Sequence, residues 1–188
     1  MWAGLFADTL RHALLAGSAL TLACLLGGPF GLLAASRGWA RSPILGAAAV
    51  GRTLPSIAVL ALLVPLLGVG APPAIAALTL LALPPIVINV DLAIRSTPAG
   101  VLDVARGLGM SPQQRFRRVV VPLALPLAFA GVRTASVEVI GSATLATFVG
   151  AGGLGDDIVR GLQTGDGRLL VVASAIVAAM ALAGEIRR

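Results

Sequence analysis

The sequence predicts an all-α membrane protein that crosses the bilayer five times. Of its 188 residues, 57% are apolar and only 12% are charged, and the mean hydropathy is +0.98. A soluble domain carries about 25% charged residues, so this composition excludes a soluble domain, a disordered chain and a coiled coil. Apolar stretches long enough for a transmembrane helix of about 20 residues recur along the chain. We therefore expect a single transmembrane domain over residues 1–188, with little left over for a soluble catalytic domain.

The spans follow from the apolar stretches in chain order. Ala13–Ser36 carries no charge and is too long for the apolar core of a cleavable signal peptide, so we expect a retained first span. Arg52 interrupts the next apolar stretch. We expect residues 43–51 to be a lead-in at the membrane surface and the second span to run from about 52 to 67. The other three spans are expected at about residues 74–93, 123–149 and 169–184.

The arginines gather on one side of the expected bundle. That side holds Arg37, Arg41, the arginines between 95 and 118, Arg187 and Arg188, while aspartates dilute the three arginines of the other side. Because basic residues accumulate on cytoplasmic loops, we expect the N-terminus outside and the C-terminus in the cytoplasm. The sequence pI of about 11.6 then reflects membrane topology and not nucleic-acid binding.

The longest polar segment between two spans, residues 95–122, predicts two short helices. Its markers, in order, are a helical stretch at 102–108, a stop at Gly109, a second start at Ser111 and Pro112, and Pro122 at the start of the fourth span. Asp103 and Arg106 are three residues apart and can pair on one helix face. Two helices joined at a glycine would form a compact knob outside the membrane, and a solvated basic loop is the alternative.

The spacing of this segment resembles the EAA loop of binding-protein-dependent ABC importer permeases. That pattern reads Glu-Ala-Ala, three residues, Gly, nine residues, Ile, one residue and Leu-Pro. The matching positions here are Asp103-Val104-Ala105, Gly109, Val119 and Val121-Pro122, with conservative replacements. The resemblance implies that this loop couples the permease to a separate ATP-hydrolysing subunit. It also implies that Asp103, Ala105 and Gly109 contact that subunit.

Further segments resemble the osmoprotectant subfamily of these permeases, which imports glycine betaine, choline, carnitine or proline. They are Thr53–Gly70, Ala82–Asn89 and Ala143–Leu162. The resemblance implies a methionine-importer-like fold in a bacterial or archaeal cytoplasmic membrane. It also implies a second permease subunit (identical or closely related), ATPase subunits that bind ATP in place of this chain, and an external solute-binding protein. A permease for methionine or another amino acid, and a helical-bundle channel or scaffold without an ATPase, are the alternatives.

Polar residues within the expected spans are candidates for the translocation path. Ionisable residues there are costly and usually face a water-filled cavity or a partner. Glu138 lies near mid-membrane, and we expect it to line the path and to favour a cationic or zwitterionic solute; a buried pair with an arginine is the alternative. Asn89 and Asp91 are weaker candidates near the inner mouth, and Arg133 either lines the path or reaches the membrane surface.

The segment after the fourth span is rich in glycine. Gly150, Gly152, Gly153 and Gly155 form a GxGxxG pattern, but the dinucleotide fingerprint must follow a strand, and this pattern follows a membrane span. We expect either a packed turn or a hinge near an external gate. A single cysteine, Cys24, and a single histidine, His12, exclude a zinc site, so we expect no metal. The few scattered aromatic residues do not favour an aromatic cage for a quaternary ammonium ligand.

Overall fold

The computed structural model describes residues 2–186, and within that range the regular structure is helical. The elements are α1 (Trp2–Ser36), α2 (Gly38–Gly51), α3 (Ser56–Leu67), α4 (Ala71–Arg95), α5 (Ala99–Gly107), α6 (Pro112–Arg115), the π-helical turn η1 (Phe116–Val120), α7 (Val121–Ser142), the 3₁₀ helix η2 (Ala143–Val149), α8 (Leu154–Thr164) and α9 (Gly167–Ile186). Arg187 and Arg188, which we counted on the cytoplasmic side, lie outside the described residues.

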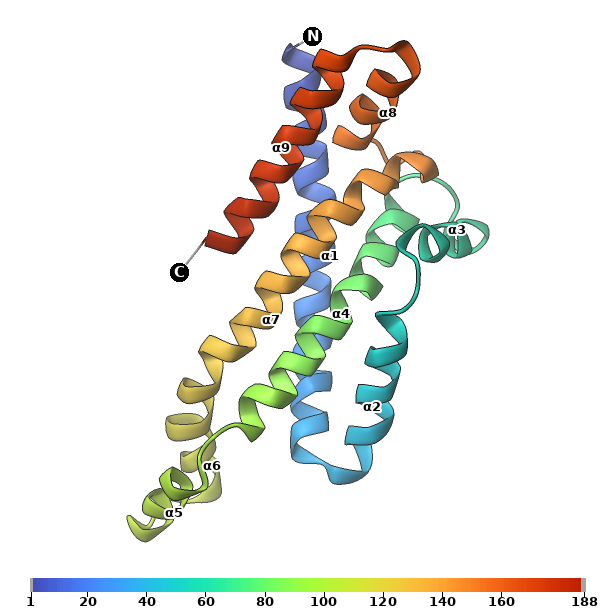
Figure 1. Ribbon diagram of the computed structural model, residues 1–188. Helices are drawn as coiled ribbons and strands as arrows, with labels where there is room; N and C mark the ends of the chain where they lie inside the picture. Colours follow the sequence, from blue (N-terminus) through green and yellow to red (C-terminus); the bar gives the residue numbers. More distant parts are fainter. Residues whose placement is uncertain (1, 187–188) are drawn as a thin grey trace.

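Helix length and composition agree with the five predicted spans when the bent pair of α2 and α3 is taken as one span. Four helical stretches are long and apolar enough to cross a membrane: Gly4–Ser36, Ala71–Arg95, Pro112–Val149 and Gly167–Glu185. The pair α2 and α3 counts as a fifth span, broken by a bend of 101°. Figure 1 shows α1, α4 and α7 along most of the length of the bundle, with α9 beside one half of it.

The second span differs from the prediction. We expected residues 43–51 to be a lead-in and the span to begin at Arg52, and this is wrong. Residues 43–51 belong to α2, which packs along α1 and α4, whereas α3 turns away after the bend. Pro55 explains the break, because proline has no N–H to continue the helix and its ring disfavours a helical conformation at the residue before it. Arg52 therefore marks the middle of a broken span.

The outer polar segment also contains more structure than expected. Residues 150–168 lie between two expected spans and are rich in glycine and aspartate, a composition that favours a loop, but Leu154–Thr164 forms helix α8. Its first turn carries Asp156 and Asp157, whose negative charge suits the positive end of the helix dipole. The helix ends at Gly165, which adopts the left-handed conformation that favours glycine.

Small residues bring the central helices close together. A Cβ on Gly31 of α1 would lie 2.6 Å from Cβ of Val90 on α4, and a Cβ on Gly131 of α7 would lie 2.5 Å from Cβ of Asn89 on α4. Both glycines are therefore required for the close approach of their helices, as is common between membrane helices. The three helices α1, α4 and α7 form the core that positions the polar features below.

Candidate functional site

The predicted knob is present at one end of the bundle. Helix α5 ends at Gly107, and Gly109 has a φ of +73°, the left-handed conformation that lets the chain reverse direction. Ser111 then caps α6: its hydroxyl accepts from the Gln114 N–H at 3.3 Å, and its own N–H donates to the Gln114 side chain at 2.8 Å. This reciprocal pair is a capping box. The local signals in the sequence therefore predicted both short helices.

The second arm of the knob continues directly into α7. Pro122 lies in the first turn of α7, where the fourth span was expected to start, and the helical stretch that contains it begins at Pro112 and runs to Val149. The π-helical turn η1 precedes the proline, and the Val121 N–H donates to the Phe116 carbonyl five residues earlier. A proline ring clashes with the carbonyl four residues before it, and the wider π turn is positioned to relieve this clash. The knob is thus fused to a membrane span.

The surface of the knob carries an apolar stripe. Val101, Val104 and Leu108 lie on one face at helical spacing, and all three are exposed, Leu108 by 76%. Asp103 accepts from Arg106 at 2.8 Å on the same helix. Ala105, however, is buried within the knob. Ala105 therefore packs inside the knob and supports its shape, and its contact with the ATPase subunit stays a prediction.

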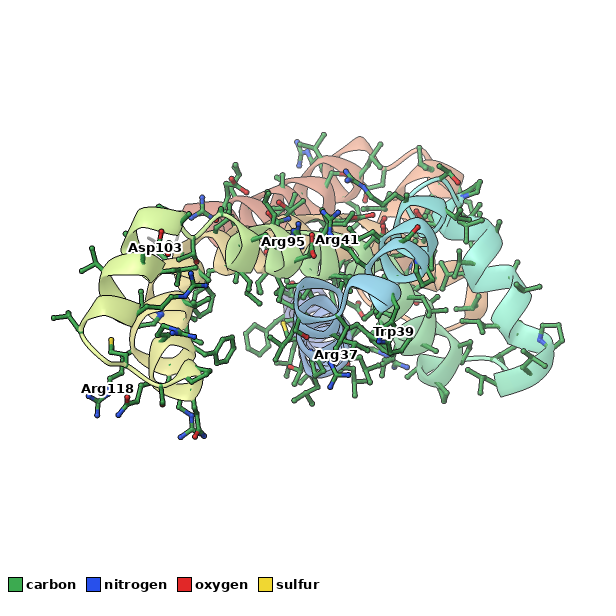
Figure 2. The ribbon with its side chains drawn as sticks, turned by 90° about the horizontal axis from the view of Figure 1, so that it is seen from below. Arg37, Trp39, Arg41, Arg95, Asp103 and Arg118 are labelled. Atoms are coloured by element: carbon green, nitrogen blue, oxygen red, sulfur yellow. The ribbon has the colours of Figure 1, made fainter. Side chains whose placement is uncertain are left out.

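Basic residues surround this end of the bundle. Figure 2, seen from this end, shows Arg95 and Asp103 on the α4–α5 side and Arg37, Trp39 and Arg41 at the α1–α2 turn. Arg118 lies on the side of the knob opposite Asp103 and points outward. Among the described residues, Arg37, Arg41, Arg95 and Arg118 therefore lie toward the same end of the bundle, as the sequence predicted.

The candidates for a translocation path separate into exposed and buried residues. Glu138 is exposed on α7, on the same stretch as exposed Thr134 and Gly141. This stripe leaves a carboxylate uncovered within an apolar helix, which the hydrocarbon of a bilayer does not tolerate. The role of Glu138 in transport stays a prediction, and the geometry leaves its carboxylate open to a path.

Asp91 and Asn89 occupy different surroundings. Asp91 is buried and accepts from Arg41 at 3.2 Å, and its predicted role near the inner mouth of the path stays a prediction. The Asn89 amide donates to the Pro85 carbonyl at 2.8 Å, and its Cβ faces Gly131 at the contact between α4 and α7. Both side chains therefore stabilise helix packing in this structure.

Arg133 forms an ion pair across two spans. Its Nη1 lies 3.9 Å from Oε1 of Glu185 on α9, and both side chains remain exposed. A loose, exposed pair of this kind contributes about 1 kcal/mol or less. Arg133 thus pairs with the last turn of α9 and not with Glu138.

The glycine-rich turn between η2 and α8 is tightly packed. Gly150, Gly152 and Gly153 have positive φ values of 71°, 77° and 96°. A Cβ on Gly152 would lie 2.9 Å from Nε of Arg11, and a Cβ on Gly155 would collide with the carbonyl of Thr144. The Arg11 Nε also donates to the Ala151 carbonyl at 2.6 Å. These contacts are those of a packed turn, the first of the two roles expected for the four glycines.

A polar cluster at the same end was not predicted from the sequence. Asp157 of α8 is buried, and its Oδ1 pairs with Arg160 at 3.3 Å while its Oδ2 has no hydrogen-bond partner among the described residues. Burial raises the pKa of Asp157, and the neighbouring Asp8 of α1 raises it further, while Arg160 lowers it. Thr147 donates to the Asp156 carboxylate. No local spacing in the sequence indicates this contact, because Asp8 and Asp157 lie far apart in the chain.

His12 belongs to the same end of the bundle. It is fully buried, and its Nε2 lies 3.0 Å from the carbonyl of Ile140 on α7. Gly153 packs against its backbone and Cβ. His12 therefore contacts both α7 and the glycine-rich turn and holds α1 against them. A single histidine in the sequence does not indicate this structural role.

Comparison with known proteins places this architecture in a family. The family described as "Binding-protein-dependent transport system inner membrane component" matches residues 27–186. The osmoprotectant import permease protein OsmW of Salmonella typhimurium is 40% identical over 179 residues, which cover 93% of this chain and 83% of OsmW. The choline transport system permease protein OpuBB of Bacillus subtilis is 41% identical over 155 residues, which cover 82% of this chain and 71% of OpuBB.

Solved structures share the fold. An inward-facing structure of the MetNI methionine ABC transporter has a TM-score of 0.79 at 24% identity and covers 96% of this chain and 93% of its own. The crystal structure of an amino acid ABC transporter with histidines has a TM-score of 0.81 at 19% identity and covers 97% and 90%. The methionine-importer-like fold is thereby confirmed. Because the family match covers most of the chain, this protein belongs to the inner membrane components of binding-protein-dependent transport systems, the permease subunits of ABC importers.

Proposed function

We propose that this permease carries a quaternary ammonium or related osmoprotectant, such as glycine betaine, choline, carnitine or proline, into the cell. The observation that carries this proposal is the 40% identity to an osmoprotectant import permease along 93% of the chain. The similarity to the methionine transporter is below 25% identity and concerns the fold alone. The osmoprotectant role therefore has support that the methionine role lacks.

The knob is the proposed contact with separate ATPase subunits. Its apolar stripe of Val101, Val104 and Leu108 is exposed next to charged residues, and a neighbouring protein is the natural cover for such a surface. Since α6, η1 and α7 form one helical stretch, a displacement of the knob would move α7 as a lever. ATP binding and hydrolysis would then occur on the partner subunits, and this chain performs no covalent chemistry.

The proposed path lies along α7. The exposed stripe of α7 with Thr134 and Glu138 is too polar to face lipid. In the assembled transporter a second permease subunit, identical or closely related, would pack over it. The solute would pass between the two subunits by alternating access. The external binding protein would dock at the end that carries α8, with the N-terminus outside and the arginine-rich end in the cytoplasm.

Solute-stimulated ATPase activity tests the substrate. The permease is reconstituted in proteoliposomes with its ATPase and binding protein, and glycine betaine, choline, carnitine, proline and methionine are compared. We expect stimulation by at least one of the first four and none by methionine. Stimulation by methionine alone would overturn the osmoprotectant assignment, and a permease that retains no ATPase on purification would overturn the importer itself.

A pair of variants tests the knob. Leu108→Glu places a charge in the apolar stripe, whereas Gln113→Glu places the same charge on an exposed residue outside it. We expect the ATPase to be lost from affinity-purified Leu108→Glu complexes and retained by Gln113→Glu. Equal retention by both variants would contradict docking on this stripe.

Labelling of introduced cysteines tests the orientation. In a Cys24→Ser background, Gln163→Cys lies on α8 and Gln113→Cys lies on the knob, and both positions are exposed. A membrane-impermeant maleimide added to intact cells should label only Gln163→Cys. Labelling of Gln113→Cys alone would reverse the proposed topology.

A further inference from the structure

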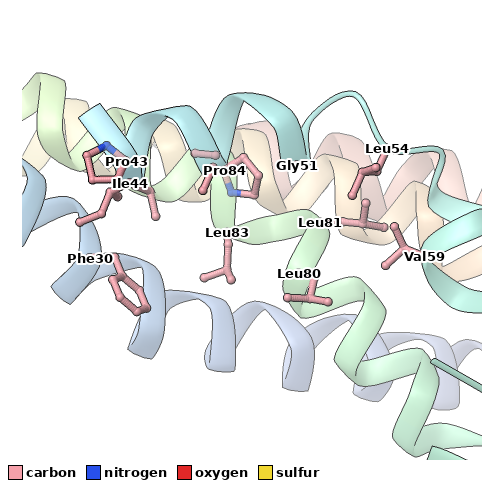
Figure 3. Close-up of a pocket in the computed structure, with 13 residues that line it drawn as sticks. Phe30, Pro43, Ile44, Gly51, Leu54, Val59, Leu80, Leu81, Leu83 and Pro84 are labelled. Atoms are coloured by element: carbon pink, nitrogen blue, oxygen red, sulfur yellow. The ribbon is translucent and has the colours of Figure 1, made fainter. Parts of the chain in front are cut away.

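An apolar groove of about 480 Å³ runs along the bundle beside the broken second span. Figure 3 shows Phe30 and Pro43 toward one end of the groove, and Leu54 and Val59 toward the other. Every residue that lines it is apolar or glycine. The groove is therefore a site for hydrocarbon, since a charged or zwitterionic solute would find no polar group to replace its hydration.

The bend between α2 and α3 creates this groove. A Cβ on Gly51 would lie 3.3 Å from Cγ of Pro84, so α2 packs closely on α4 at its last residue. The chain then turns by 101°, and α3 leaves the path that a straight span would follow. The small side chains of Ala47 and Ala48 line the remaining space without filling it.

The groove lies apart from the proposed path and from the knob. Among the described residues, those that line it come from α1, α2, α3, α4 and the bend at Leu54. Helix α7, which carries Glu138, packs against α1 and α4 but contributes nothing to the lining. A second subunit that covers the polar stripe of α7 therefore leaves this groove facing the bilayer.

The end of the groove at Phe30 and Pro43 leads to the α1–α2 turn. Trp39 lies in that turn with 74% of its surface exposed, and Arg37 is exposed beside it. Tryptophan is enriched at the boundary between hydrocarbon and headgroups, and arginine attracts anionic lipid headgroups and binds phosphate. Arg41 is held by Asp91 but keeps 44% of its side chain exposed toward the same end.

We infer that one anionic phospholipid of the cytoplasmic leaflet occupies this groove. An acyl chain fills the space between Phe30 and Leu54, and the phosphate lies at the α1–α2 turn beside Arg37 and Trp39. The choice of leaflet rests on the proposed orientation, which the cysteine labelling tests separately. The charge at one end and the apolar lining of the rest together specify a lipid, and neither a free anion nor a soluble ligand satisfies both.

Native mass spectrometry of the whole transporter tests this inference. The complex is purified in detergent and exposed to an equal mixture of phosphatidylglycerol and phosphatidylcholine, and the retained lipids are counted. We expect the wild type to retain phosphatidylglycerol in preference. Ala47→Phe, which fills the groove, should lower retention of both lipids, while Ala49→Phe on the same helix lies outside the lining and should not.

Arg37→Gln separates the headgroup contact from the acyl-chain contact. This exposed substitution should reduce the preference for phosphatidylglycerol about fivefold, since one basic residue near a membrane surface contributes about 1 kcal/mol, and should leave retention of phosphatidylcholine unchanged. Equal lipid retention by wild type and Ala47→Phe would overturn the inference. Loss of a second permease copy from Ala47→Phe, with lipid counts unchanged, would show that another subunit occupies the groove and would equally overturn it.

Discussion

Arg41 of α2 and Asp91 of α4 form an ion pair between two neighbouring helices. The Nη2 of Arg41 lies 3.2 Å from Oδ2 of Asp91, and Nε lies 3.3 Å from Oδ1. The Asp91 side chain is only 5% exposed, whereas that of Arg41 is 44% exposed. Because α4 ends one turn later at Arg95, this pair fixes the half of the broken span before its bend to the helix that leads into the knob.

The unequal burial of this pair predicts unequal effects of its two substitutions. Arg41→Gln leaves a buried carboxylate without its cation and should destabilise the protein by about 1–3 kcal/mol. Asp91→Asn frees a guanidinium that already reaches water, so its effect should be smaller. The thermal midpoint of the complex in one detergent measures both, and Arg37→Gln, on the same turn but outside the pair, should stay near the wild type.

The double variant Arg41→Gln/Asp91→Asn checks the cause. In the double variant no buried carboxylate is left without a cation. The thermal midpoint of the double variant should therefore lie close to that of Asp91→Asn. A double variant as unstable as the sum of the two single ones would show that the ion pair is not responsible.

The glycine-rich outer turn predicts a second ranking. Gly150→Ala meets open space and incurs only the strain of a left-handed alanine, about 1 kcal/mol. Gly155→Ala adds a Cβ against the backbone carbonyl of Thr144, which cannot move as a side chain would. We expect a larger loss of thermal stability, about 3 kcal/mol, and a lower yield of folded protein. Similar midpoints for the two variants would contradict the packed turn.

The sequence was informative where structure is determined by neighbouring residues. Gly109 and Ser111 mark the turn and the cap of the knob because a positive φ and a capping box each need particular residue types at fixed spacing. The apolar stretches likewise predicted where spans would lie. Hydropathy does not report direction, however, so the 101° bend at Arg52–Pro55 and its apolar groove were visible only in the structure.

The contacts that the sequence did not predict join residues far apart in the chain. Arg41 and Asp91 are separated by 50 positions, and Arg11 and Ala151 by 140. Which span lies against which depends on packing of small residues such as Gly31 and Gly131, and a single sequence does not show these pairings. The sequence therefore did not predict that Asp91 pairs with Arg41 on another helix.

The capping box at Ser111 predicts a loss of coupling. Ser111→Ala removes the hydroxyl that accepts from the Gln114 N–H and should destabilise the start of α6 by about 1 kcal/mol. If the knob transmits motion to α7, transport per ATP hydrolysed should fall in proteoliposomes. Gln113→Ala changes an exposed neighbour with no part in the cap and should keep the wild-type ratio. If both variants transport the same amount of solute per ATP hydrolysed, the capping box does not contribute to coupling.

The buried Asp157 predicts that the outer end becomes more stable as the pH falls through the raised pKa of this carboxyl. Burial raises the pKa of this carboxyl above its ordinary value of 3.8, and Asp8 and Asp156 raise it further against the opposing effect of Arg160. An acid whose pKa is raised by folding binds its proton more tightly in the folded state. Its protonated form therefore favours the packing of α8 on α1 below the raised pKa, and this advantage is lost as the pH rises through that value.

Hydrogen exchange of α8 measures this effect. Protection of its amides should increase as the pH falls through the raised pKa of Asp157, after correction for the intrinsic exchange rate. Asp157→Asn keeps the shape of the side chain and removes its titratable carboxyl. Protection of the α8 amides in this variant should therefore be high and independent of pH. Asp166→Asn, on an exposed aspartate that caps α9 and lies outside the cluster, should retain the wild-type dependence. A pH-dependent α8 in Asp157→Asn would assign the effect to another group.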